Sequence, residues 1–113
     1  MMNITAPAWE MKRTDETRHI EDALRRAGFE KADAYRYNSA SIRVRLIDSR
    51  FEGLSPAQRD AMVEPHLEQL PESTQADIMN LFTFAPSELQ QTQKTCREFL
   101  LNTEFEDPSP SIL

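Results

Sequence analysis

The segment that follows Thr14 has the clearest helical pattern in the chain. Apolar residues recur there at the i, i+3, i+4 and i+7 positions that form one face of an α-helix, namely Ile20, Ala23, Leu24 and Ala27. Thr14 and Asp15 are both good N-cap residues, and Gly28 suits the left-handed position that follows many helices. The pattern predicts a helix that begins near residue 14 and ends before Gly28.

Two short strands are predicted next, over residues 32–37 and 41–48. In the second strand apolar and polar residues alternate; the apolar positions are Ile42, Val44 and Leu46, and the polar positions are Ser41, Arg43 and Arg45. This period of two is typical of a strand with one buried face and one polar face. Asn38 and Ser39 lie between the strands and suit a tight turn. We therefore expect an antiparallel hairpin.

A second long helix is predicted from Ser55. Ser55, Pro56 and Gln58 combine a capping box with a proline at the first helical position. Pro65 should kink this helix because it removes one hydrogen bond, and Pro71 should end it.

The remaining sequence predicts two shorter elements and a last helix. A short helix is expected over residues 72–77 and a third strand over residues 78–85, which are rich in isoleucine, leucine and phenylalanine. Ser87 and Gln90 form another capping box, which opens a helix that runs to about Leu101. The residues expected on the buried face of that helix are Leu89, Cys96, Phe99 and Leu100.

These elements define an α+β fold with the order α-β-β-α-α-β and an extra C-terminal helix. A three-stranded sheet needs helices on at least one face, and we expect the helices on one face. The predicted organisation is a flexible leader at 1–13, a domain at 14–86, a C-terminal helix at 87–103 and a disordered acidic tail at 104–113.

Composition narrows the function classes. The 113 residues carry a net charge of −6, and 39% of them are apolar, which is enough for one modest core. Residues 1–50 have ten basic and eight acidic side chains (+2), and residues 51–113 have three and eleven (−8). This balance argues against general affinity for nucleic acid. One cysteine excludes an intrachain disulfide, and no apolar run is long enough for a membrane span. A cytoplasmic protein with no membrane partner is expected.

The stretch from Thr14 to about Pro86 resembles the BolA-like family. The segment that carries the resemblance is Arg50-Phe51-Glu52-Gly53-Leu54-Ser55, followed by Arg59 and then Met62-Val63 and Leu67. BolA-like proteins have a similar F-x-G element after the second strand, and the elements around it fall in the family's order. The resemblance implies a fold related to the type II KH arrangement. It also implies a monothiol glutaredoxin partner with a shared [2Fe–2S] cluster, or, as a weaker implication, DNA binding.

The sequence departs from the family at the positions that would ligate a cluster. Asp60 stands where the family has a histidine after arginine, and Leu81 stands at the histidine of the last strand. The loop between the first two strands shrinks to Asn38 and Ser39. Cluster ligation needs thiolate or imidazole, so we expect no cofactor and no metal. His19, His66 and Cys96 lack a second histidine or cysteine at ligand spacing, and a carrier built on them is only a third possibility.

The sequence therefore predicts a small non-enzymatic interaction or regulatory module. The expected partner-binding residues are Phe51, Glu52, Gly53 and Arg59. The alternative is a KH-like nucleic-acid-binding protein, in which arginines and aromatic rings on the sheet hold phosphates and stack bases. Its candidate residues are Arg36, Arg43, Arg45, Tyr35 and Tyr37. The other interpretation of this set is a sheet face that is covered by the C-terminal helix or by a partner.

Overall fold

The computed structural model describes residues 7–90 and 97–111, and its centre is a three-stranded mixed sheet. The strands are β1 (Lys31–Asn38), β2 (Ser41–Ile47) and β3 (Ile78–Phe84), in the spatial order β1-β2-β3. β1 and β2 are antiparallel, as predicted, and β3 runs parallel to β2. The α+β class and the order of elements are confirmed.

Three helices cover one face of the sheet: α1 (Asp15–Arg26), α2 (Pro56–Leu67) and α3 (Glu72–Asp77). The capping predictions hold for the two longer ones, since the Thr14 hydroxyl accepts from Thr17 N–H at 3.1 Å and the Ser55 hydroxyl accepts from Gln58 N–H at 3.2 Å. The core on this face joins α1 and α2 to the inward residues of the strands; it includes Ile20, Leu24, Phe29, Val44, Leu46, Phe51 and Val63.

The α2 helix ends earlier than predicted, because its last residue is Leu67 and Pro71 instead precedes α3. Between β2 and α2 the chain passes through a 3-10 helix, η2 (Ser49–Phe51), and then turns at Gly53. The φ angle of Gly53 is +75°, a conformation that side-chain-bearing residues rarely adopt. Gly28, with a φ of +102°, ends α1 in the predicted way.

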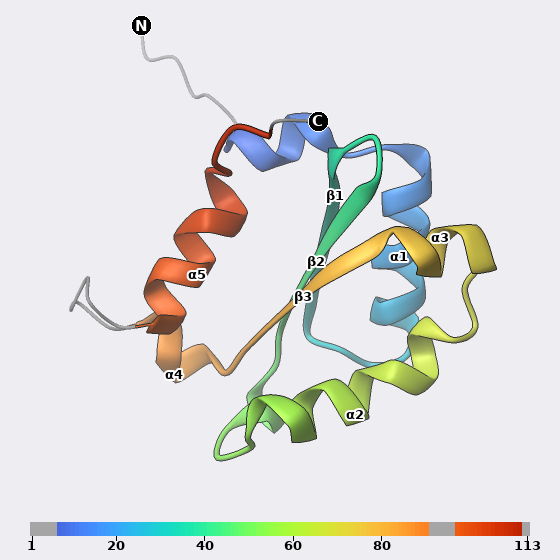
Figure 1. The fold of residues 1–113 in the computed structure, drawn as a ribbon. Helices are drawn as coiled ribbons and strands as arrows, with labels where there is room; N and C mark the ends of the chain where they lie inside the picture. The colour runs from blue at the N-terminus through green and yellow to red at the C-terminus, as the bar shows by residue number, and fades with distance from the viewer. Residues whose placement is uncertain (1–6, 91–96, 112–113) are drawn as a thin grey trace, which may run out of the picture.

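The opposite face of the sheet is also covered, by elements outside the predicted α-β-β-α-α-β core. A 3-10 helix, η1 (Ala8–Lys12), and α5 (Arg97–Glu106) pack there (Figure 1). Trp9, Tyr35 and Phe105 form a second buried cluster between them. The face of β2 that alternation marked as polar is therefore an interior face, and Arg43 and Arg45 are buried in it.

The C-terminal region also differs from the predicted single helix. A short helix, α4 (Pro86–Leu89), follows β3, and α5 begins at Arg97. The capping contact of α4 runs from Ala85 N–H to the Glu88 carboxylate, rather than from Ser87 to Gln90. Leu100, expected to be buried, is 53% exposed. Cys96 lies outside the described residues.

Both chain ends contribute to the second layer. Trp9 is only 5% exposed although the leader was predicted to be flexible, because its ring packs 5.4 Å from the ring of Phe105. The segment from residue 104, predicted to be disordered, completes α5 and buries Phe105. The Tyr37 hydroxyl then donates to the Ser109 carbonyl at 2.7 Å. Across the described ranges no helix is long and apolar enough to cross a membrane.

Candidate functional site

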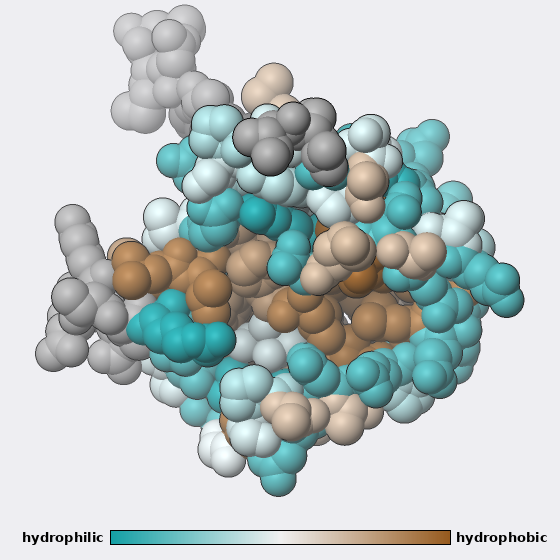
Figure 2. Space-filling model, in the orientation of Figure 1, coloured by the Kyte–Doolittle hydropathy of each residue, from teal (hydrophilic) through white to brown (hydrophobic). Residues whose placement is uncertain are grey.

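A groove runs along the outer edge of β3, between α2 on one side and α4 and α5 on the other. Its volume is about 370 Å³. Its apolar lining residues are Leu54, Leu81, Phe82, Phe84 and Leu101. Figure 2 shows apolar residues gathered in a band across this face, with polar residues above and below it. Polar and charged side chains share this lining, namely Arg59, Asp60, Asn80, Thr83, Glu88, Arg97 and Glu98. A hollow that combines apolar side chains with convergent polar groups is a usual form of a binding site.

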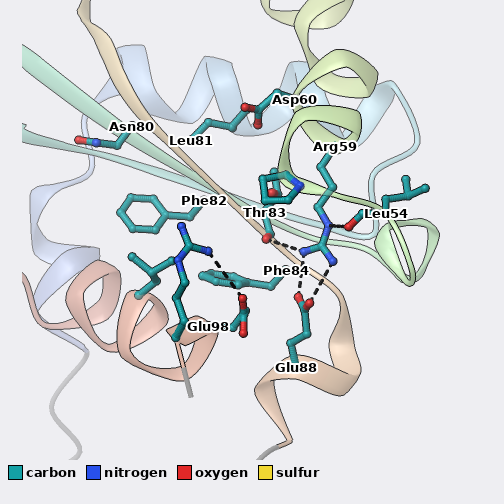
Figure 3. A pocket seen from close by; sticks show the side chains of 13 residues that line it. Leu54, Arg59, Asp60, Asn80, Leu81, Phe82, Thr83, Phe84, Glu88 and Glu98 are labelled. Atoms are coloured by element: carbon teal, nitrogen blue, oxygen red, sulfur yellow. Dashed lines mark hydrogen bonds and ion pairs between the residues drawn. The ribbon is translucent and has the colours of Figure 1, made fainter. Parts of the chain in front are cut away.

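Arg59 is fixed at one end of the groove. It is 6% exposed, and its guanidinium donates two hydrogen bonds to the Glu88 carboxylate at 2.9 and 3.0 Å (Figure 3). It also donates to the Leu54 carbonyl and the Thr83 carbonyl, each at 3.0 Å. The hydrogen bonds from Arg59 lower the pKa of Glu88 below its ordinary value. This bidentate pair links α2 to α4 and holds the charged end of the groove rigid.

Asp60, the next residue on α2, has a different environment. Burial raises the pKa of its carboxyl above the ordinary value. Among the described residues no hydrogen bond or ion pair to its side chain is present, although it lines the same groove as Arg59. A partly desolvated carboxylate with no cation beside it is costly, so Asp60 is the unbalanced charge of this groove.

The buried carboxyl of Asp60 should make the wild type less stable as the pH rises, and Asp60→Asn is expected to remove this pH dependence. The pKa of Asp60 is raised above 3.8 by burial, so just above that pH the folded state holds a proton that the unfolded state has released. Stability then falls as the pH rises through this window. Urea denaturation between about pH 3.5 and 6 measures the effect. The free energy of unfolding of Asp60→Asn minus that of the wild type should increase as the pH rises.

High salt provides a control for this measurement. A shift caused by desolvation persists at about 1 M salt, where interactions between separated charges are screened. A difference between the two proteins that does not change with pH, or that shrinks as the pH rises, would contradict the assignment of Asp60.

The predicted partner-binding residues are only partly brought together. Arg59 lines the groove, but Phe51 is fully buried beneath it and belongs to the core. Glu52 and Gly53 are exposed in the turn before α2. The Glu52 carboxylate accepts from the Ser87 hydroxyl at 2.7 Å, so it ties this turn to α4.

The candidate nucleic-acid residues do not form an open surface. Arg45 is 1% exposed and donates to the Asp33 carboxylate at 2.7 Å and to the Glu106 carboxylate at 2.7 Å. Arg43 donates to the Glu104 carboxylate at 2.9 Å, and its guanidinium lies 3.7 Å from the ring centre of Tyr37.

The other two candidates are also engaged. Tyr35 is fully buried, and burial is the main cause of its raised pKa. Arg36 lies apart from the other candidates, since it pairs with Glu16 at 2.8 Å and with Asp77 at 2.6 Å. Four of the five candidates, Arg43, Arg45, Tyr35 and Tyr37, thus belong to the contact between the sheet and α5. The charge of the fifth, Arg36, is balanced by α1 and α3.

Sequence reasoning missed the acidic partners of the sheet arginines. Glu104 and Glu106 lie two residues apart on α5, as Arg43 and Arg45 do on β2. The equal two-residue spacing of the arginines and the glutamates could have indicated this pairing. It becomes informative only once α5 is placed on the sheet.

The residues present do not fit the cluster that the family resemblance implies. The carboxylate of Asp60 and the apolar side chain of Leu81 line one groove, but neither is a thiolate or an imidazole. The turn between β1 and β2 consists of Ser39 and Ala40. Within the described ranges no group of three or more histidine, cysteine or acidic side chains is placed to hold a metal ion.

Neither histidine lines the groove. His19 is exposed on α1. The imidazole of His66 stacks edge-on against Phe29, with ring centres 5.6 Å apart. His19 therefore has a surface position, and His66 has a boundary position beside the core residue Phe29.

Comparisons of the chain with models of protein families, with curated sequences and with solved structures find no match. Membership in the BolA-like family stays a prediction made from the sequence.

Proposed function

We propose that this chain is a non-enzymatic interaction module that binds a partner protein in the groove along β3. The observation that carries the proposal is the groove between α2 and α5, where partly exposed apolar side chains lie beside charged ones. Exposed apolar patches with polar rims are typical of protein-binding surfaces. The rigid pair of Arg59 and Glu88 gives one end of the groove a fixed shape.

The resemblance to BolA-like proteins supplies one partner to test, a monothiol glutaredoxin. Asp60 and Leu81 stand at the positions that the resemblance marks as ligands, and both line the groove. A complex formed there would rest on protein contacts without cluster ligation by these two residues. Nucleic acid is the less supported ligand, because Arg43, Arg45 and Tyr35 are buried.

A capture experiment with a blocked groove tests the proposal. Asn80 is exposed and lines the groove, so Asn80→Arg should fill the groove at little cost to folding. Met11→Arg is the control, since Met11 is 79% exposed on η1. The wild type and Met11→Arg should retain the same protein from the native cell extract, and Asn80→Arg should lose it. Purified glutaredoxin should be titrated against the same three proteins by calorimetry.

The outcomes separate clearly. Loss of one retained protein in Asn80→Arg alone, reproduced with the purified partner, is the expected result. Equal retention by all three proteins contradicts binding in the groove, and so does a purified partner that binds Asn80→Arg as tightly as the wild type.

A further inference from the structure

The two edges of the sheet differ in how far side chains occupy their backbone hydrogen-bonding groups. The outer edge of β1 is occupied by side chains from α1: Ala34 N–H donates to the Glu21 carboxylate at 2.8 Å, and Arg25 donates to the Ala32 carbonyl at 2.9 Å. Covering an edge in this way prevents another chain from pairing with it. The β1 edge is therefore closed to strand addition.

The outer edge of β3 is largely open. The Thr83 carbonyl accepts from Arg59, whereas the Phe84 carbonyl accepts from Asp48 N–H on the side of β2. Backbone groups of successive strand residues point to opposite edges, so Thr83 and Leu81 direct their backbone groups away from β2. Among the described residues no hydrogen bond from outside the sheet reaches Leu81 or the Thr83 N–H. In Figure 1 no helix lies in front of β3.

This open edge and the groove coincide. Five consecutive residues of β3, from Asn80 to Phe84, line the groove and extend over roughly 13 Å at the usual rise of a strand. The register places the side chains of Leu81 and Thr83 with the α2 side of the sheet, and that of Phe82 with the α5 side. The edge thus lies between two walls that can receive alternate side chains of an added strand.

We propose that the groove binds an extended segment of a partner protein, which joins the sheet as a fourth strand beside β3 and carries a lysine or arginine opposite Asp60. This inference rests on the proposed function and names the form and charge of the partner. The added strand would pair with the backbone of Leu81 and with the Thr83 N–H, while Arg59 keeps the Thr83 carbonyl.

The charges of the groove favour a basic segment. Arg59 is balanced by Glu88 and Arg97 by Glu98, at 2.9 and 3.6 Å, whereas Asp60 has no partner among the described residues. The chain as a whole carries −6. A cationic side chain near Asp60 would offset the cost of its desolvation. A second copy of this acidic chain would bring no net positive charge and is therefore the less favoured occupant.

Short labelled peptides test the form of the ligand. The probe is a peptide of alternating valine and lysine, and binding is measured by fluorescence anisotropy and by the amide signals of Leu81 and Thr83 in NMR spectra. We expect both amide signals to shift and their hydrogen exchange to slow on binding. Methylating the backbone nitrogens along one edge of the peptide should weaken binding about tenfold or more, and methylating the other edge should not, because only one edge pairs with β3.

Charge variants test the role of Asp60. Replacing lysine by glutamate in the peptide should abolish measurable binding, and Asp60→Asn should weaken the lysine peptide about three- to tenfold. Asp22→Asn, at a site 58% exposed on α1, is the matched control and should leave binding unchanged. Equal binding of the lysine and glutamate peptides would overturn the proposed charge, and unperturbed Leu81 and Thr83 amides at millimolar peptide would overturn strand addition.

The outcomes also separate this inference from the proposed function. In one outcome, Asn80→Arg loses the partner, but in the wild type the Leu81 and Thr83 amides still exchange freely when the partner is bound. This outcome contradicts strand addition and leaves groove binding intact. Self-association that Asn80→Arg abolishes and that the lysine peptide cannot displace identifies a second copy as the occupant and overturns the inference. A partner retained by Asn80→Arg contradicts the proposed function itself.

Discussion

Replacing Arg45 with methionine is expected to lower the free energy of unfolding by about 3–5 kcal/mol, the usual cost of removing one member of a buried ion pair. Arg45 is 1% exposed, and its guanidinium binds Asp33, Asn102 and Glu106 at 2.7 Å each. Methionine fills similar volume but leaves the Asp33 carboxylate, only 5% exposed, without its closest cation. Urea denaturation measures the change directly.

Two further variants identify the cause of that loss. Arg36→Met removes a pair that is about one-quarter exposed and should cost about 1 kcal/mol or less. Adding Asp33→Leu to Arg45→Met removes the orphaned carboxylate and should recover part of the stability. A cost below about 1 kcal/mol for Arg45→Met would show that the pair contributes little net free energy.

The first layer of the fold could be predicted from the sequence because its signals are local. Thr14 and Ser55 cap helices by contacts that span three residues, and the apolar face of α1 is visible in its own spacing. The strand pattern of β2 was equally clear. Each of these features depends on residues that are neighbours in the chain, so a window of about ten to twenty residues contains them.

The second layer could not be predicted because its interactions span the whole chain. The partners of Arg43 and Arg45 on α5 lie 57 and 61 residues away. Local alternation therefore marked this face of β2 as polar, and it could not decide whether the C-terminal helix or a partner covers it. The predicted stripe through Leu89 and Leu100 assumed one continuous helix. In the structure α4 ends at Leu89 and α5 begins at Arg97. Leu89 and Leu100 therefore lie on different helices and do not share one helical face.

The groove was missed for the same reason. Its residues come from α2, β3 and the α4–α5 region, three segments that only the tertiary fold brings together. Arg59 was selected from the sequence through a family motif, whereas Asp60 was regarded as the position of a lost ligand. Its unbalanced charge becomes visible only when its burial and its missing cation are seen together.

Phe105→Ala is the most direct test of the second layer, and we expect it to lower the free energy of unfolding by about 3–5 kcal/mol. Phe105 is fully buried, and its ring centre lies 4.8 Å from that of Tyr35 and 5.4 Å from that of Trp9. Leu100→Ala on the same helix is the control; because Leu100 is 53% exposed, it should change stability by about 0.5 kcal/mol or less. The two predictions reverse the order expected from the sequence, which placed Leu100 in the core and residue 105 in a disordered tail. Equal small losses in both variants would mean that α5 is not docked on the sheet in solution, and that Arg43 and Arg45 are open to solvent.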